Sequence, residues 1–273
     1  MFNFAPILSY VCTLMFTLIS TSDLQQLYFD RISKYSCTVT DDNYAVFEKN
    51  EHMLILMSEI ENNSIAVFDL YKKEFIFFRS GIKHKTRTGY DNDNKHLHQF
   101  YAQLHPEDIG FVLDTKIKLF DFLTDLPPTE RNNYNLVFNF RMKNKEGAYC
   151  QYIQRQMVIE SDNEGKPWLV ININNLLSEQ STKFTLQRHL VNLKTGKFHL
   201  FNNELEVGAT QLFTEREKEV FALIAQGLDS MAIAEKLFIS EHTVNNHRRH
   251  VLSKTHTANT IQALAYAKLL GII

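Results

Sequence analysis

A series of helix start and stop signals near the C-terminus constrains this chain more than any other feature. Thr214 and Glu217 form the S/T-x-x-E pattern of a capping box, in which each side chain binds the backbone amide of the other residue. Gly227 stands where a helix starting at this box would end, because glycine readily adopts the left-handed conformation that closes helices. Asp229 and Ser240 are suitable N-caps for two further helices. The segment therefore predicts three short helices in succession.

The second and third of these helices are joined by the short turn at 238–239, and the third helix is basic. Two helices joined in this way form a helix-turn-helix unit, whose later helix enters the major groove of DNA. The chain has no acidic residue from position 242 to its end, and its basic and titratable residues there are Arg248, Arg249, Lys254, Lys268, His242, His247, His250 and His256. The whole chain has a net charge of -2, so the positive charge is confined to this C-terminal segment. Such a segment suits the phosphate backbone of DNA.

The order of individual residues is more specific than the charge. About the last 60 residues resemble the LuxR-type helix-turn-helix family, which includes GerE and the NarL/FixJ output domains. The matching residues are Leu212, Thr214, Arg216, Glu217, Glu219, Val220, Gly227, Leu228, Ile233, Ala234, Lys236, Leu237, Ile239, Ser240, Thr243, Val244, His247 and Arg248, followed by Lys254, Ala258, Asn259, Thr260, Ala263, Tyr266 and Ala267. The resemblance implies a four-helix domain that binds DNA.

The resemblance also implies which side chains of the third helix face DNA. The positions that correspond to base-reading residues of the family are Asn245, Asn246 and Arg249. Asparagine suits adenine and arginine suits guanine. The expected phosphate contacts are Thr243, Arg248 and Lys254. The opposite stripe, which we expect to pack on the scaffold, consists of Val244, His247, Val251 and Leu252.

Two positions depart from the family pattern. Lysine is frequent in the family where this chain has Asn245, so the family's target sequence does not carry over. Leucine usually follows the lysine where this chain has Thr255, so packing at that point is expected to differ.

A last helix is expected from Asn259 to Leu270, with Asn259 as its cap and Gly271 just beyond its end. In the family this helix often forms the dimer contact. The corresponding apolar residues are Ile261, Leu264, Ala265 and Leu269. We therefore expect a homodimer that binds double-stranded DNA at two half-sites.

The pattern upstream changes to strands and short helices. Strands are expected around 65–67 and 75–77, helices at 97–103 and 106–123, and further strands at 134–143, 148–160 and 168–174. This order resembles a PAS domain, as do the strings at Gly89-Tyr90, 104–108, 140–149 and 162–167. The predicted fold class is α+β: a PAS-like antiparallel sheet with helices, followed by the all-α helix-turn-helix domain. The segments 190–193 and 198–201 read as one more hairpin, which either extends the sheet or acts as a lever between the domains.

The resemblance implies a domain that senses small molecules, light or redox state, or that serves only as a dimer platform. The sequence contains no specific cofactor motif, so the cofactor stays unknown, and a small-molecule ligand of the PAS-like domain is one alternative. We expect His96, His98 and His105 to be loop or helix-cap residues and not haem ligands. Cys12, Cys37 and Cys150 are scattered without metal-ligand spacing, so neither a metal site nor a disulfide framework is expected. Cys150 falls in a predicted strand and is expected in the core.

The first residues are unusually apolar. Residues 2–22 carry no charge. This segment is just long enough for a membrane anchor, although Pro6 shortens its continuous apolar part. They lack the basic start of a signal peptide. The alternatives are an inner-membrane anchor with the remainder in the cytoplasm, an apolar helix in a dimer interface, and a start codon assigned too far upstream. A cytoplasmic location is expected.

The predicted organisation has four parts: an apolar segment with helices at 1–61, a PAS-like sensor domain at 62–178, a linker at 179–210 and the helix-turn-helix domain at 211–273. These parts predict a bacterial transcription regulator that binds specific DNA sequences, and whose PAS-like domain senses a signal or mediates dimerisation. RNA polymerase is a further candidate partner. The alternatives are a protein-interaction module that has lost DNA binding and a membrane-anchored regulator. The sequence has no Gly-rich phosphate loop or nucleophile elbow, so we do not expect an enzyme.

Overall fold

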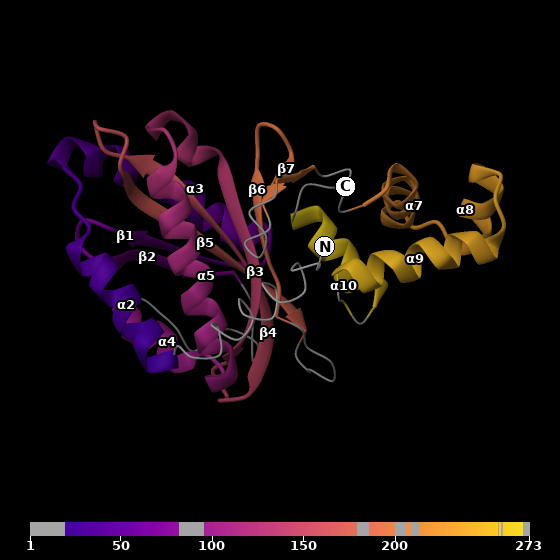
Figure 1. Cartoon of the computed structure of the whole chain (residues 1–273), viewed down its shortest axis with the longest axis horizontal. Helices are drawn as coiled ribbons and strands as arrows, with labels where there is room; N and C mark the ends of the chain where they lie inside the picture. The colour runs from indigo at the N-terminus through magenta and orange to yellow at the C-terminus, as the bar shows by residue number, and fades with distance from the viewer. Residues whose placement is uncertain are drawn as a thin grey trace, which may run out of the picture.

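Alternating hydrophobic residues in the middle of the chain form one antiparallel sheet (Figure 1). The computed structural model describes residues 20–81, 96–178, 186–199, 206–208, 213–255, 257 and 259–269. Its strands are β1 (Ser64–Asp69), β2 (Glu74–Ser80), β3 (Tyr134–Lys143), β4 (Tyr149–Ser161), β5 (Pro167–Ser178), β6 (Arg188–Asn192), β7 (Lys197–His199) and β8 (Glu206–Gly208). They lie side by side in the order β2-β1-β5-β4-β3-β6-β7-β8.

The first five strands, in the order β2-β1-β5-β4-β3, have the arrangement of a PAS domain, with the helices inserted between β2 and β3. The predicted PAS-like fold and the α+β class are therefore confirmed. The structure also decides between the two roles left open for the hairpin at 190–201. β6 pairs with β3, with Tyr134 opposite Asn192, so the hairpin extends the sheet. The sequence did not predict β8, which pairs with β7.

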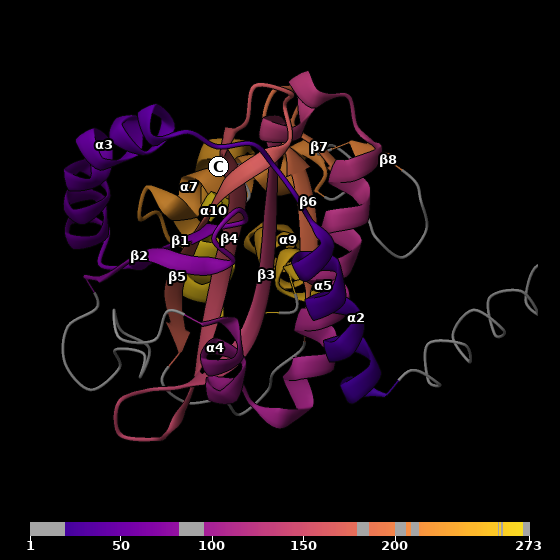
Figure 2. The same cartoon turned by 90° about the vertical axis from the view of Figure 1, so that its left-hand side faces the viewer.

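Helices cover both faces of this sheet (Figure 2). The first face carries α2 (Thr21–Lys34), α4 (Leu97–Gln103) and α5 (Pro106–Asp125), and the short 3-10 helix η2 (Pro128–Asn133) follows α5. The second face carries α3 (Asp41–Ile60), whose Tyr44 ring meets the buried Trp168 edge-on at a centroid distance of 5.0 Å. The sequence predicted α4 and α5, and it predicted helices without bounds within residues 1–61, where α2 and α3 lie.

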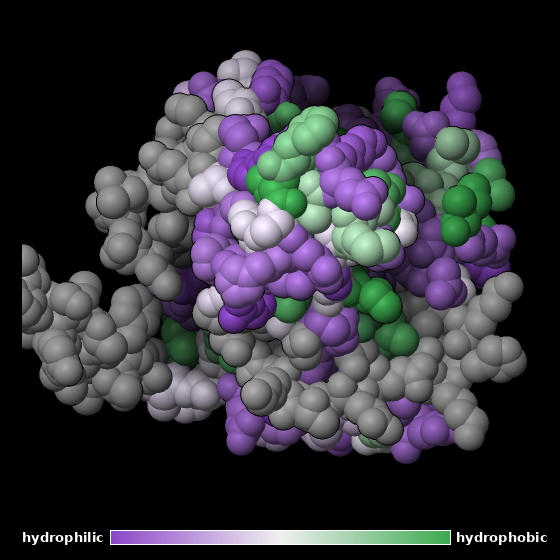
Figure 3. Space-filling view, turned by 90° about the vertical axis from the view of Figure 1, so that its right-hand side faces the viewer, coloured by the Kyte–Doolittle hydropathy of each residue, from purple (hydrophilic) through white to green (hydrophobic). Residues whose placement is uncertain are grey.

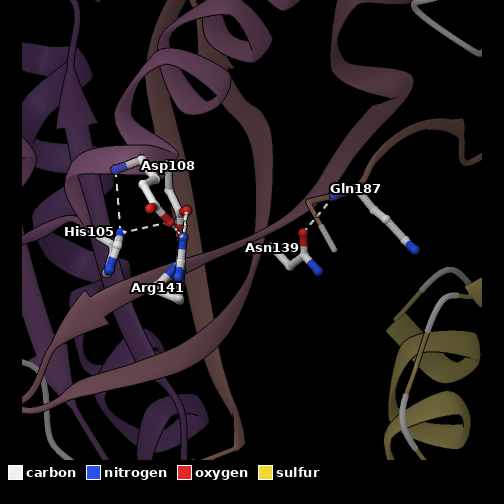
Figure 4. Close-up of polar contacts among 6 residues, drawn as sticks. His105, Asp108, Asn139, Arg141 and Gln187 are labelled. Atoms are coloured by element: carbon white, nitrogen blue, oxygen red, sulfur yellow. Dashed lines mark hydrogen bonds and ion pairs between the residues drawn. The ribbon is translucent and has the colours of Figure 1, made fainter. Parts of the chain in front are cut away.

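A buried ion pair fixes the start of α5 against the sheet (Figure 4). The carboxylate of Asp108 is fully buried and accepts hydrogen bonds from the backbone N–H of Arg141 at 2.7 Å and from its Nε at 3.0 Å. His105 caps the helix, because its Nδ1 accepts from the amide of Glu107. His105 is thus a helix-cap residue as predicted, and His96 is the N-cap of α4. These contacts set the orientation of α5 over the first face of the sheet.

The C-terminal segment forms the predicted short helices: α7 (Glu215–Ala225), α8 (Ser230–Leu237), α9 (Glu241–Thr255) and α10 (Thr260–Leu269). The capping box of Thr214 and Glu217 is formed, and Gly227 has a φ of 89°, as its position after the helix requires. The side chains of Asp229, Ser240 and Asn259 all accept from backbone amides at the starts of their helices. The local signals of the sequence therefore define these helices correctly.

Several further expectations concern single residues or segments. Cys37 and Cys150 are buried, and burial is the main cause that raises the pKa of Cys37 to about 11. The His, Cys, Asp and Glu side chains of the described ranges form no cluster that could hold a metal.

Three sets of residues with predictions lie outside the described residues: Gly89-Tyr90, Cys12 and the apolar residues 2–19. None of the helices that the structure does describe has the length and hydrophobicity to span a membrane.

Candidate nucleic-acid interface

Two buried valines seat α9 on the rest of the helical domain. Val244 is fully buried against Val220 and Ile233 of the two preceding helices, and Val251 packs with Phe221 and Ala263. These contacts confirm that Val244 and Val251 form the scaffold side of the helix. His247 is half-buried, and Leu252 is half-buried against the same core. Val244 and Val251 therefore lie on the side of α9 that the sequence predicted to pack on the scaffold.

The three predicted base-contacting residues differ in their surroundings. Arg249 is exposed, and its guanidinium donates to Oδ1 of the half-buried Asn246. Asn245 is half-buried and turned toward α8, where its Oδ1 accepts from the hydroxyl of Ser230 at 2.8 Å. The structure thus brings Asn246 and Arg249 together on one side of α9, and it places Asn245 at the contact between the two helices of the helix-turn-helix unit.

The predicted phosphate-contacting residues are each held by neighbours within the domain. Thr243 shares a hydrogen bond with Ser240 at the start of α9. Arg248 donates to Ser230 at 2.7 Å and to Thr260 at 3.2 Å, so it joins α8, α9 and the start of α10. An arginine with two such partners is held in one orientation, which lowers the entropic cost of any further contact that it makes.

Lys254 forms an ion pair with a nearly buried carboxylate. Its Nζ lies 2.6 Å from Oε2 of Glu217, whose side chain is only 3% exposed. Burial raises the pKa of Glu217, but the ion pair with Lys254 and the amide of Thr214 outweigh burial, and the net pKa is below the ordinary value. Glu217 therefore does two things: it closes the capping box of α7 and it fixes the end of α9.

The last helix presents two different faces. Ala263, Tyr266 and Ala267 are buried, and the predicted dimer-contact residues Ile261 and Ala265 are exposed, with Ile261 80% exposed. Leu264 is half-buried against the core of the helical domain. The side chain of Leu269 lies outside the described residues. The exposed side of α10 thus carries Ile261 near its start and Ala265 in its middle.

Hydrophilic side chains cover most of the helical end of the molecule, with smaller hydrophobic areas between them (Figure 3). Two hydrophobic residues of the helix-turn-helix unit are strongly exposed: Met231 is 62% exposed and Phe238 is 95% exposed. Phe238 forms the turn between α8 and α9 and has a positive φ of 53°. A polar surface with cations on α9 is what a DNA-binding face requires.

Three features of the structure were not predicted from the sequence. Ser230 binds both Asn245 and Arg248, and no local pattern indicates this role. The ion pair of Glu217 with Lys254 joins residues far apart in the sequence. Lys116 is buried in α5, and a signal for it exists: it lies three and four residues after the buried Leu113 and Val112, on the apolar stripe of an amphipathic helix.

These four helices define the class of the C-terminal domain: a helix-turn-helix unit with a supporting helix on either side. Residues 211–267 match the family of bacterial regulatory proteins, luxR family (GerE). The spore germination protein GerE of Bacillus subtilis is 38% identical over 68 residues, which are 25% of this chain and 92% of GerE. The chain therefore belongs to the LuxR family of bacterial regulatory proteins, as the sequence predicted.

Other similarities cover less of the relative or have a lower identity. The transcriptional regulatory protein YxjL of Bacillus subtilis is 44% identical over 61 residues, which are 22% of this chain and 28% of that relative. This chain thus spans less than a third of the length of the first relatives that it matches. Among solved structures, VqmA of Vibrio cholerae, described as a LuxR-type receptor, is 15% identical with a TM-score of 0.31, over 81% of this chain and 88% of VqmA.

Proposed function

We propose that this protein is a transcription regulator that binds specific DNA sequences through α9, under the control of the PAS-like domain. The observation that carries the proposal is the position of Arg249 beside Asn246 on the side of α9 opposite its buried valines. Placed in the major groove, an arginine reads guanine and an asparagine reads adenine. Membership of the LuxR family supports this reading of the helix.

The remaining contacts follow from the same placement. We assign Asn246 and Arg249 to the base edges, together with the Nδ2 donors of Asn245, whose Oδ1 accepts from Ser230. We assign Thr243, Arg248 and Lys254 to the phosphates. Arg248 and Lys254 reach the backbone with their internal partners retained, because a guanidinium has five donors and an ammonium has three. These contacts position the helix without reading sequence.

The regulator acts as a homodimer in this proposal. We assign the self-complementary contact to Ile261, Leu264, Ala265 and Leu269 of α10, of which Ile261 and Ala265 are exposed. Two copies bring two recognition helices to half-sites one helical turn apart, which gives a small domain sufficient affinity. The PAS-like domain senses a signal or contributes to this dimer, and RNA polymerase is the partner through which transcription changes. Because bacterial DNA lies in the cytoplasm, we place the described domains there.

The test is binding of the purified chain to genomic DNA fragments across a salt series. We expect selective binding that weakens as salt rises, since contacts to phosphates release counterions. Arg249→Ala should lose about 1–3 kcal/mol at the selected site and lose its preference for that site. Lys218→Ala is the matched control, because Lys218 is a cation of α7 paired with Glu215, away from the proposed contacts.

Two results would count against the proposal. Equal effects of the Arg249 and Lys218 variants would show that Arg249 does not read a base. A folded protein that binds no DNA at low salt, with or without its signal, would instead favour a protein-interaction module that has lost DNA binding.

A further inference from the structure

A cavity of about 370 Å³ lies between α2, α5 and the first face of the sheet. Its walls are mostly apolar, with Tyr28 and Ile32 from α2, Leu119 and Leu123 from α5, and Phe68 and Val170 from the sheet. Known ligand pockets have volumes of about 300–1,000 Å³ and this kind of lining, with a small number of polar groups that orient the ligand. The polar groups of this cavity therefore indicate what it binds.

One of these polar groups is the ammonium of Lys116. The residue is 8% exposed, and its Nζ donates to Oε1 of Gln156 at 2.9 Å. The rings of Phe100 and Phe138 lie nearby, with centroids 5.8 and 5.7 Å from Nζ. No carboxylate in the described part of the chain forms an ion pair with it, and burial lowers its pKa to about 7. Burying a lysine without a counter-charge destabilises the folded state, so stability of the fold does not explain a lysine at this position.

Amide side chains lie beside Lys116. Asn172 lines the large cavity, and Gln154 and Asn174 line a smaller space of about 20 Å³ that shares Lys116 and Asn172 with it. All three amides are more than nine-tenths buried. Within the described residues, Oδ1 of Asn172, Oδ1 of Asn174 and Oε1 of Gln154 have no hydrogen-bond partner. Buried acceptors without partners cost free energy, which a donor group of a ligand would recover.

We propose that this cavity binds a small, mostly apolar carboxylic acid whose carboxylate pairs with Lys116. The proposal rests on the role of the PAS-like domain as a sensor, and it names the chemical class of the signal. The carboxylate supplies the counter-charge that the protein itself does not provide, through a short charge-assisted hydrogen bond. A hydroxyl or amine elsewhere on the same acid donates to the unpartnered amide oxygens, and its apolar body fills the rest of the cavity.

The neutral forms of such ligands lack the feature that Lys116 recognises. A primary amide or an alcohol of the same shape fits the apolar walls but leaves the ammonium without a counter-charge. The cavity should therefore discriminate between an acid and its amide by about ten- to a hundredfold in affinity, the range expected for one charged hydrogen bond. This discrimination is the property to measure.

The experiment is a thermal-shift and calorimetric screen of the full chain against a panel of small aromatic and aliphatic monocarboxylic acids, each beside its primary amide. Acids should bind more tightly than their amides, and Lys116→Met should remove this preference. Lys118→Met is the matched control, because Lys118 is on the same helix but pairs with Asp114 outside the cavity. Asn172→Leu should weaken only those acids that also carry a hydroxyl or an amine.

The outcomes separate this inference from the proposed function. DNA binding is measured on the same samples, so DNA binding without any binding of acids overturns the ligand proposal alone. Binding of acids without binding of DNA overturns the proposed function and leaves the ligand site in place. Equal affinity for acids and amides, or a preference that survives Lys116→Met, shows that Lys116 does not recognise a carboxylate.

Discussion

The phenol ring of Tyr266 on α10 meets the imidazole ring of His189 on β6 edge-on, with ring centroids 5.5 Å apart. Both residues are buried, and they join the helical domain to the sheet domain. Leu190, the next residue of β6, packs in the core under α5, so His189 points to the opposite face of the sheet. The last helix of the DNA-binding domain therefore lies against an added strand of the sensor sheet.

This contact should couple the two domains energetically. A double-mutant cycle with His189→Ala and Tyr266→Ala should give an interaction energy of about 0.5–1.5 kcal/mol, typical of an aromatic pair. Unfolding by urea, followed by the fluorescence of Trp168, reports on the sheet domain, because Trp168 is the single tryptophan and is buried in that domain. Additive effects of the two variants would show that the rings do not contact each other in solution.

Lys116→Met should stabilise the ligand-free protein by roughly 2–4 kcal/mol at pH 7. The pKa of Lys116 is lowered from 10.5 to about 7 in the folded chain, so the unfolded chain binds more protons between these two values. The free energy of unfolding of the wild type therefore increases as pH rises from about 7 to 10.5, and that of the variant lacks this increase. Urea unfolding at several pH values checks this, and an advantage of the variant that stays constant over that window would contradict it.

Lys254→Met should destabilise the helical domain by about 2 kcal/mol at neutral pH, because it leaves the carboxylate of Glu217 buried without its counter-charge. The pKa of Glu217 is lowered in the folded chain, so its contribution to stability is fully present above its unfolded pKa of 4.5 and is lost as pH falls through the folded value. The difference between variant and wild type should therefore shrink in acid. Helical circular dichroism during thermal unfolding measures it, and a difference that does not change with pH would refute this role of the ion pair.

Phe238→Gly should stabilise the helix-turn-helix unit by about 0.5–1 kcal/mol. Phe238 has a left-handed backbone with a φ of 53° and a ψ of 45°, and its ring is 95% exposed, so its side chain contributes little burial. Phe238→Ala is the control, because it removes the ring but keeps the Cβ that strains this conformation. A gain from alanine as large as that from glycine would assign the effect to the ring and not to the backbone.

The sequence by itself determined the local features of this protein. The capping box of Thr214 and Glu217, the caps Asp229 and Asn259, and Gly227 set the helix boundaries, because each acts on the backbone within four residues of itself. The alternation of apolar residues determined the strands in the same way. The buried side of α9 also followed from its spacing of apolar residues, and the order of individual residues carried the resemblance to the LuxR-type family.

Only the tertiary structure decided which distant residues meet. The addition of β6 to the edge of β3, the pairing of Glu217 with Lys254, the contact of Ser230 with Arg248 and the packing of His189 on Tyr266 all join residues whose separation along the chain carries no local signal. The same holds for the cavity around Lys116. A lysine on an apolar helix stripe is visible in the sequence, but whether it meets a carboxylate, solvent or an empty cavity depends on the packing of α2, α5 and the sheet, because charge pairing and desolvation act through space and not along the chain.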